Sequence, residues 1–182
     1  IAEGEVLQLI NCRDPNVNEE NYLQVIRYKT AKLFEAATRL GAILSDVSPE
    51  EEESMASYGM HLGTAFQLTD DMLDYSGDYH DTGKNLGDDL AEGKPTLPLI
   101  YAMKNGSQEQ ANIVSKAIQN GGGEGVLESV LKVIHETDAL DYTRKKAEAE
   151  SCMATEAISL LPDSQYKKCL MQLAVFAVSR NY

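Results

Sequence analysis

Three aspartates, Asp70, Asp71 and Asp74, are spaced so that all of them fall within about one turn of a helix. Two carboxylates about 4 Å apart repel each other by roughly 4 kcal/mol at an effective dielectric of 20, so a cation should compensate them. Hard oxygen ligands that are few in number, completed by water and substrate phosphates, suit Mg²⁺. The aspartates are therefore candidate metal ligands, although this motif alone would also fit a solvated acidic face.

The helix expected around these aspartates favours the metal site. Most of the circumference of residues 59–74 is apolar, and one narrow stripe lies within about 60° of the direction of Gln67: Met60, Gly63, Thr64, Gln67, Asp70, Asp71 and Asp74. A helix with this pattern is normally central, so its polar stripe faces either partner side chains or a wet cavity, because buried unpaired carboxylates are costly. Gly59 and Gly63 on this helix fit either close helix packing or an open tunnel.

The segment that follows, residues 83–98, carries two lysines among glycines and acids. Lys84 and Lys94 could neutralise diphosphate oxygens beside a metal-binding carboxylate cluster. An ordinary surface loop with solvated charges is the alternative.

The rest of the chain shows helical signals and no strand signals, which predicts an all-α helical bundle. Ser48-Pro49-Glu50-Glu51 is a capping box with proline at the first helical position, and it begins the helix that should run to about Tyr79. The other expected helices cover residues 18–44, 96–102, 107–120, 137–161 and 163–180, with a break at Pro162.

Length and charge narrow the class of protein. A chain of 182 residues is sufficient for one helical domain, which we assign to residues 1–182. The net charge of −13 argues against nucleic acid as a partner, and no apolar run approaches the roughly 20 residues of a membrane span. Three widely spaced cysteines favour reduced thiols in a cytoplasmic protein. The chain opens on Ile1 in what reads as the middle of a helix, so we expect a fragment.

Two stretches of sequence resemble a known family. FQLTDDMLDY followed by GKNLGDDLAEGKPTLPL is similar to the second aspartate-rich region of the trans-isoprenyl diphosphate synthases, and is most similar to the bacterial octaprenyl group. IAEGEVLQLIN and YKTAKLFEAA also match the family's pattern, in the expected order. The resemblance implies a helical bundle of the isoprenoid synthase type, of which this chain would be the C-terminal part, with the N-terminal helices missing.

The resemblance also implies an activity. A synthase of this family condenses isopentenyl diphosphate with an allylic diphosphate, head to tail, to make a polyprenyl diphosphate such as the octaprenyl precursor of a quinone side chain. Mg²⁺ ions held between two aspartate-rich motifs bind the allylic diphosphate, whose ionisation leaves a carbocation. The family's enzymes are homodimers, with a hydrophobic tunnel for the growing chain in each subunit.

Carried over residue by residue, the resemblance gives Asp70, Asp71 and Asp74 to the metal site, with Asp70 as the most direct ligand. Lys29 and Thr30 would approach the diphosphate and the developing cation. Gln67 would lie beside the reacting carbons, and Lys84 and Lys94 would hold phosphate oxygens.

Some of the family's pattern is absent from this chain. The first aspartate-rich motif and the basic residues that bind isopentenyl diphosphate would both lie before Ile1, so we expect the isolated chain to be inactive. The alternatives are a short-chain synthase that makes farnesyl or geranylgeranyl diphosphate, a class I terpene cyclase, and a non-catalytic partner subunit. The lysine-bearing loop argues against the cyclase, and the intact DDxxD motif with both loop lysines argues against the partner subunit.

Overall fold

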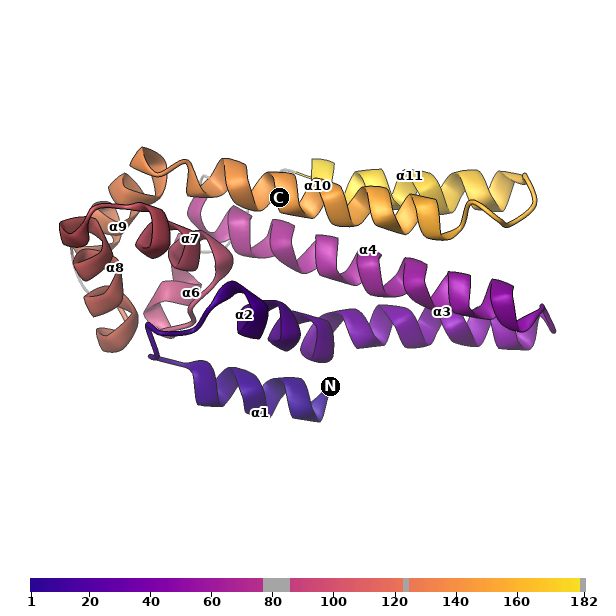
Figure 1. The fold of residues 1–182 in the computed structure, drawn as a ribbon, viewed down its shortest axis with the longest axis horizontal. Helices are drawn as coiled ribbons and strands as arrows, with labels where there is room; N and C mark the ends of the chain where they lie inside the picture. The colour runs from indigo at the N-terminus through magenta and orange to yellow at the C-terminus, as the bar shows by residue number, and fades with distance from the viewer. Residues whose placement is uncertain (77–85, 123–124, 181–182) are drawn as a thin grey trace.

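The computed structural model describes residues 1–76, 86–122 and 125–180, and its described elements are all helical. The prediction of an all-α bundle is confirmed (Figure 1). The elements are α1 (Ala2–Asn11), α2 (Glu19–Ile26), the π-helix η1 (Arg27–Ala31), α3 (Lys32–Leu44), α4 (Pro49–Ser76), α6 (Asp88–Ala91), α7 (Leu97–Asn105), α8 (Gln108–Asn120), α9 (Val126–Glu136), α10 (Ala139–Ala157) and α11 (Gln165–Ser179).

The helix predicted from Asn18 to Leu44 is continuous but not regular. The Asn18 side chain accepts a hydrogen bond from the backbone N–H of Asn21 at 2.8 Å, which satisfies one of the free donors at the helix start. The middle of the helix, Arg27–Ala31, is a π-helix, closed by the N–H of Lys32 on the carbonyl of Arg27. Single π turns inside α-helices are frequent at functional sites, and the sequence pattern gave no sign of this one.

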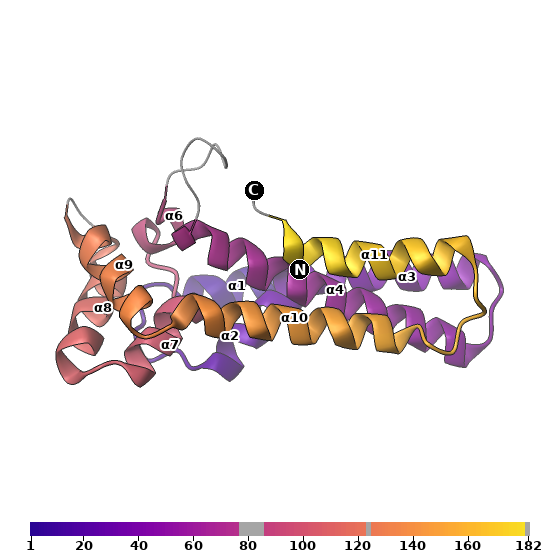
Figure 2. The same cartoon turned by 90° about the horizontal axis from the view of Figure 1, so that it is seen from above.

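Helix α4 is central, as predicted. Ser48 and Glu51 form the expected capping box, with the Glu51 N–H donating to Ser48 Oγ at 3.2 Å and the Ser48 N–H to Glu51 Oε2 at 3.0 Å. Along its length α4 packs between α3 on one side and α10 and α11 on the other (Figures 1 and 2). Ala65 and Leu68 on α4 are fully buried. The predicted end near Tyr79 lies outside the described residues.

Helices α7, α8 and α9 gather at one end of the long bundle (Figure 1). Ser107 and Gln110 form the capping box that begins α8, and α8 ends at Gly121, whose φ of +73° suits glycine. Helix α9 had no separate boundary in the sequence analysis. The last two helices begin slightly later than predicted; Ser164, rather than Asp163, caps α11. In the described part of the chain, no helix has both the length and the apolar character needed to cross a membrane.

Glycines on α4 allow η1 and α3 to approach it closely. A Cβ atom added to Gly59 would collide with the side chain of Thr38 and lie 2.6 Å from the carbonyl oxygen of Phe34. A Cβ atom on Gly63 would lie 2.6 Å from the Cα of Ala31. Both neighbours are backbone atoms that cannot move aside easily. Of the two uses left open for these glycines, the structure therefore favours close helix packing.

We expect Gly63→Ala to lower the free energy of unfolding of the full-length protein by about 1–3 kcal/mol, because overpacking outweighs the gain in helix propensity. Gly41→Ala is the control, since Gly41 is an exposed α3 glycine with no atom within 4 Å of the added Cβ. Gly41→Ala should raise the stability by up to about 1 kcal/mol. Urea denaturation of both variants would measure these changes, and an equal rise for both would refute the close packing.

Candidate active site

A cavity of about 540 Å³ opens beside α4 and gathers the predicted residues. Its lining comes from α1, α2, η1, α4, α6, the segment before α7 and the end of α11. The predicted site residues in the described part of the chain all line it: Lys29, Thr30, Gln67, Asp70, Asp71, Asp74 and Lys94. Lys84 lies outside the described residues. Chain segments far apart in sequence thus meet at one place.

The aspartates of α4 differ in their surroundings. The side chain of Asp70 is 37% exposed, whereas Asp71 is only 4% exposed. Burial, followed by repulsion from Asp89, raises the pKa of Asp71 and of Asp74 to about 7. Asp89 belongs to α6, and its backbone N–H donates to Asp74 Oδ2 at 3.2 Å. Asp89 was not among the predicted site residues, because its motif gave no reason to prefer it over the neighbouring acids.

These carboxylates fit one particular mode of magnesium binding. Among the described residues, no three histidine, cysteine, aspartate or glutamate side chains converge closely enough to form a cage for a metal ion. Mg²⁺ seldom uses such a cage; it is usually bound through one or two carboxylates, with water and substrate phosphates filling the other positions. Hard oxygen donors on one wall of an open cavity, with pKa values raised by burial and by repulsion from Asp89, suit that arrangement.

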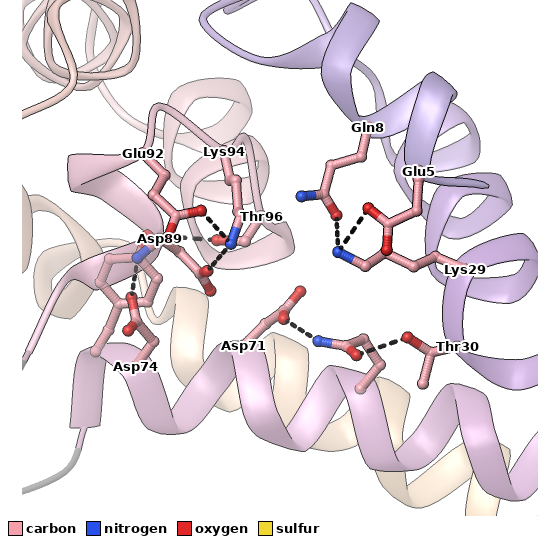
Figure 3. A network of polar contacts seen from close by, with 12 residues as sticks. Glu5, Gln8, Lys29, Thr30, Asp71, Asp74, Asp89, Glu92, Lys94 and Thr96 are labelled. Atoms are coloured by element: carbon pink, nitrogen blue, oxygen red, sulfur yellow. Dashed lines mark hydrogen bonds and ion pairs between the residues drawn. The ribbon is translucent and has the colours of Figure 1, made fainter. Parts of the chain in front are cut away.

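Two lysines face each other across the cavity. Lys94 Nζ binds Glu92 Oε2 at 2.6 Å and Asp89 Oδ1 at 3.1 Å. Burial opposes the charge of Lys94, but these two acids outweigh it and raise its pKa. On the opposite side, Lys29 Nζ donates to Gln8 Oε1 at 2.9 Å and lies 3.3 Å from Glu5 Oε2 (Figure 3). The lysines were predicted, and their acidic partners were not.

A chain of hydrogen bonds runs along the floor of the cavity. The Thr30 hydroxyl donates to Gln67 Oε1 at 2.9 Å, and Gln67 Nε2 donates to Asp71 Oδ1 at 2.8 Å (Figure 3). The hydroxyl of Tyr22, on α2, donates to the other oxygen of Asp71 at 2.6 Å. Tyr22 is buried and lines the cavity, but it stands in no motif and was missed.

Arg180 is a second residue that the sequence analysis missed. Its side chain is 11% exposed, and its Nη2 donates to the carbonyl of Phe66 at 2.8 Å and lies 3.9 Å from Asp70 Oδ1. The guanidinium also lies over the ring of Phe66, 3.9 Å from its centroid. Burial lowers the pKa of Arg180, and Asp70 partly opposes that shift. Arg180 follows α11, and no local pattern could reveal that it returns to α4.

Carboxylates on one wall and three cationic side chains around them can bind a polyphosphate together with a divalent cation. The cations neutralise phosphate oxygens directly, and the carboxylates reach them through the metal.

The family model described as polyprenyl synthetase matches residues 1–134. Over 181 residues the chain is 51% identical to the octaprenyl diphosphate synthase of Escherichia coli, covering 100% of this chain and 56% of that protein. It is 46% identical to a geranyl-diphosphate-specific all-trans-nonaprenyl-diphosphate synthase of Rhodobacter capsulatus, covering 99% of this chain and 55% of the relative. The chain therefore spans about half the length of these relatives.

Solved structures show the same helical arrangement. A polyprenyl synthase from Caulobacter crescentus, complexed with calcium and isoprenyl diphosphate, superposes with a TM-score of 0.94 at 40% identity, covering 100% of this chain and 56% of that one. A decaprenyl diphosphate synthase from Rhodobacter capsulatus gives a TM-score of 0.92 at 37% identity, with the same coverage. The fold is that of the isoprenoid synthases, and the chain belongs to the polyprenyl synthetase family.

Proposed function

We propose that residues 1–182 are the C-terminal part of a Mg²⁺-dependent trans-prenyltransferase domain. The enzyme condenses isopentenyl diphosphate with an allylic diphosphate and makes a long-chain polyprenyl diphosphate of the octaprenyl type, the precursor of a quinone side chain. One observation carries this proposal: residues from η1, from α4 and from the segment before α7, each named by the family's motifs, line a single cavity. The 51% identity to an octaprenyl diphosphate synthase supports the long-chain product.

In this proposal Asp70, Asp71 and Asp74 hold the metal. When bound, Mg²⁺ neutralises the allylic diphosphate and stabilises the pyrophosphate that leaves. Lys29 and Lys94 bind phosphate oxygens from opposite sides of the cavity, and Lys84 assists them. Lys29 and Lys94 are already held in place by carboxylate or amide partners, so little side-chain entropy is lost when the substrate arrives.

The polar side chains on the floor of the cavity stabilise the carbocation. Gln67 and Thr30 present fixed dipoles where positive charge develops, and a preorganised dipole needs no reorientation during the reaction. Val25 and Ile26 add apolar side chains to the lining, which limits the access of water to the cation. The isopentenyl double bond then attacks the allylic carbon, and loss of a proton completes the new C–C unit.

The enzyme is further proposed to be a cytoplasmic homodimer. Exposed apolar side chains on α1 and on α3 support a protein partner: Leu9, Ile10, Leu33 and Leu40 are 56–72% exposed. Single exposed apolar residues are ordinary, but two large ones on each of two helices favour contact with another protein chain. Light scattering of the full-length protein would measure its mass in solution, and a monomer would refute the dimer.

The test of the proposed function uses the full-length protein with farnesyl diphosphate, labelled isopentenyl diphosphate and Mg²⁺. Chromatography of the products should show a ladder that ends near eight isoprene units. Products that stop at three or four units would keep the chemistry and replace the long-chain assignment with a short-chain one. Absence of any product would overturn the assignment of this protein as an enzyme and favour a non-catalytic partner subunit.

The 182-residue chain by itself is expected to give no product in the same assay. The proposed mechanism needs the family's first aspartate-rich motif as well as a site for isopentenyl diphosphate, and residues 1–182 contain neither pattern. Circular dichroism would first establish that the isolated chain is helical. Turnover by the folded 182-residue chain would contradict this prediction.

A further inference from the structure

A chain of hydrogen bonds between side chains connects three helical segments, and Tyr22 lies at one end of it. It begins at Tyr22 on α2, passes through Asp71 and Gln67 on α4, and reaches Thr30 on η1, with donor–acceptor distances of 2.6, 2.8 and 2.9 Å. Tyr22 and Asp71 are each 4% exposed, so water does not replace these bonds readily. Side-chain networks in such surroundings fix the geometry of their members.

The direction of each bond follows from the chemistry of the groups. Both oxygens of Asp71 accept, one from Tyr22 and one from Gln67. In its ionised form Asp71 offers only acceptors, so the Gln67 amide turns its NH₂ toward Asp71 and its oxygen toward Thr30. The Thr30 hydroxyl then donates to that oxygen. The orientation of Asp71 therefore decides the orientation of two dipoles that line the cavity.

We propose that Tyr22 is a positioning residue for prenyl transfer, which holds Asp71 and thereby fixes the Gln67 amide and the Thr30 hydroxyl beside the reacting carbons. This inference rests on the proposed function and adds a role to Asp71. Of the paired aspartates, Asp70 is the more open to the cavity, whereas Asp71 is enclosed and has both oxygens engaged. Asp71 accordingly serves the dipoles of the floor more than it serves the metal.

The first test is Tyr22→Phe in the full-length enzyme. Phenylalanine keeps the ring and removes only the hydroxyl, so Asp71 and the Gln67 amide gain freedom to rotate. We expect kcat to fall about tenfold, with unchanged KM values for both diphosphates and an unchanged Mg²⁺ requirement. An unaltered kcat would overturn the proposal, and so would a raised Mg²⁺ requirement, because it would make Asp71 chiefly a metal ligand.

Tyr58→Phe is the matched control. Tyr58 is also fully buried, and its hydroxyl donates to the carbonyl of Leu170 at 2.8 Å, but it does not line the cavity. Its loss should lower the midpoint of thermal denaturation by an amount similar to that of Tyr22→Phe and leave kcat unchanged. An equal fall of kcat in both variants would reduce the effect of Tyr22 to general stability and overturn the positioning role.

A double-mutant cycle identifies the residue through which Tyr22 acts. If Tyr22 works by orienting Gln67, then Tyr22→Phe should change kcat less than about twofold when Gln67 is already alanine. A full tenfold loss in the Gln67→Ala background would overturn the proposal. Failure of the proposed function is separate, because it would appear as absence of product from the unmodified enzyme.

Discussion

Asp70→Ala in the full-length enzyme is expected to lower kcat by about 10³-fold or more. The proposed metal stabilises the charge on the leaving pyrophosphate, a contribution of several kcal/mol, and each 1.4 kcal/mol corresponds to a factor of ten in rate. Asp70 is the most exposed of the paired aspartates on the cavity wall and is best placed to be a direct ligand. Steady-state turnover of labelled isopentenyl diphosphate would measure the loss.

Asp163→Ala provides the control for removal of a carboxylate. The Asp163 side chain is 96% exposed, pairs with Lys167 at 3.5 Å and lies outside the cavity lining. Its substitution should leave kcat within a factor of two. A titration with Mg²⁺ adds a second readout, since Asp70→Ala should require higher Mg²⁺ for half-maximal activity. Normal turnover by the Asp70 variant at ordinary Mg²⁺ would exclude Asp70 from the metal site.

The second large effect is expected for Lys94→Ala, which should lower kcat/KM for the allylic diphosphate about 10- to 100-fold. A hydrogen bond to a charged group contributes about 1.5–3 kcal/mol, which corresponds to that range. The lysine can reach a phosphate at little cost, because its 2.6 Å partner Glu92 is 62% exposed and an exposed ion pair contributes about 1 kcal/mol or less. The more buried partner, Asp89, would lose its counter-charge in the variant.

Two control variants, Lys94→Arg and Lys116→Ala, accompany this prediction. Arginine keeps the positive charge but changes the shape of the donor group, so an intermediate loss is expected. Lys116 is an exposed lysine of α8 outside the cavity lining, and its removal should change nothing measurable. If the alanine variants at positions 94 and 116 had the same kcat/KM, the proposed phosphate contact of Lys94 would be wrong.

Local sequence signals predicted much of the fold. Asn18, Ser48 and Ser107 are caps whose hydrogen bonds the structure shows, because a cap depends on residues only three positions apart. The polar stripe on α4 also predicted that this helix would be central. Boundaries were less accurate near Pro162, where Asp163 and Ser164 are both suitable caps and only the packed structure selects Ser164.

The residues of the candidate site were likewise predicted where the signal is local and missed where it is not. Its motif residues were predicted because they are close together in sequence and chemically distinctive. Tyr22 and Arg180 were not, because each joins the site across a long sequence separation: Tyr22 contacts Asp71, and Arg180 contacts Phe66. Such contacts depend on how helices are arranged in space, which no local spacing records. A tyrosine in an otherwise apolar helix face looks like any core residue until its hydroxyl partner is known.

The π turn at Arg27–Ala31 sets the directions in which the side chains before and after it point. Tyr22 and Phe34 both face α4, the first through Asp71 and the second through the ring of Phe66, at 5.6 Å between centroids. In an unbroken α-helix their directions would differ by about 120°, and the extra residue of a π turn reduces this to about 20°. Rewinding of Arg27–Ala31 into a regular α-helix, with no residue lost, would turn Tyr22 away from α4. The π turn therefore keeps Tyr22 and Phe34 on the same side of a helix that has one residue more between them than a regular α-helix would need.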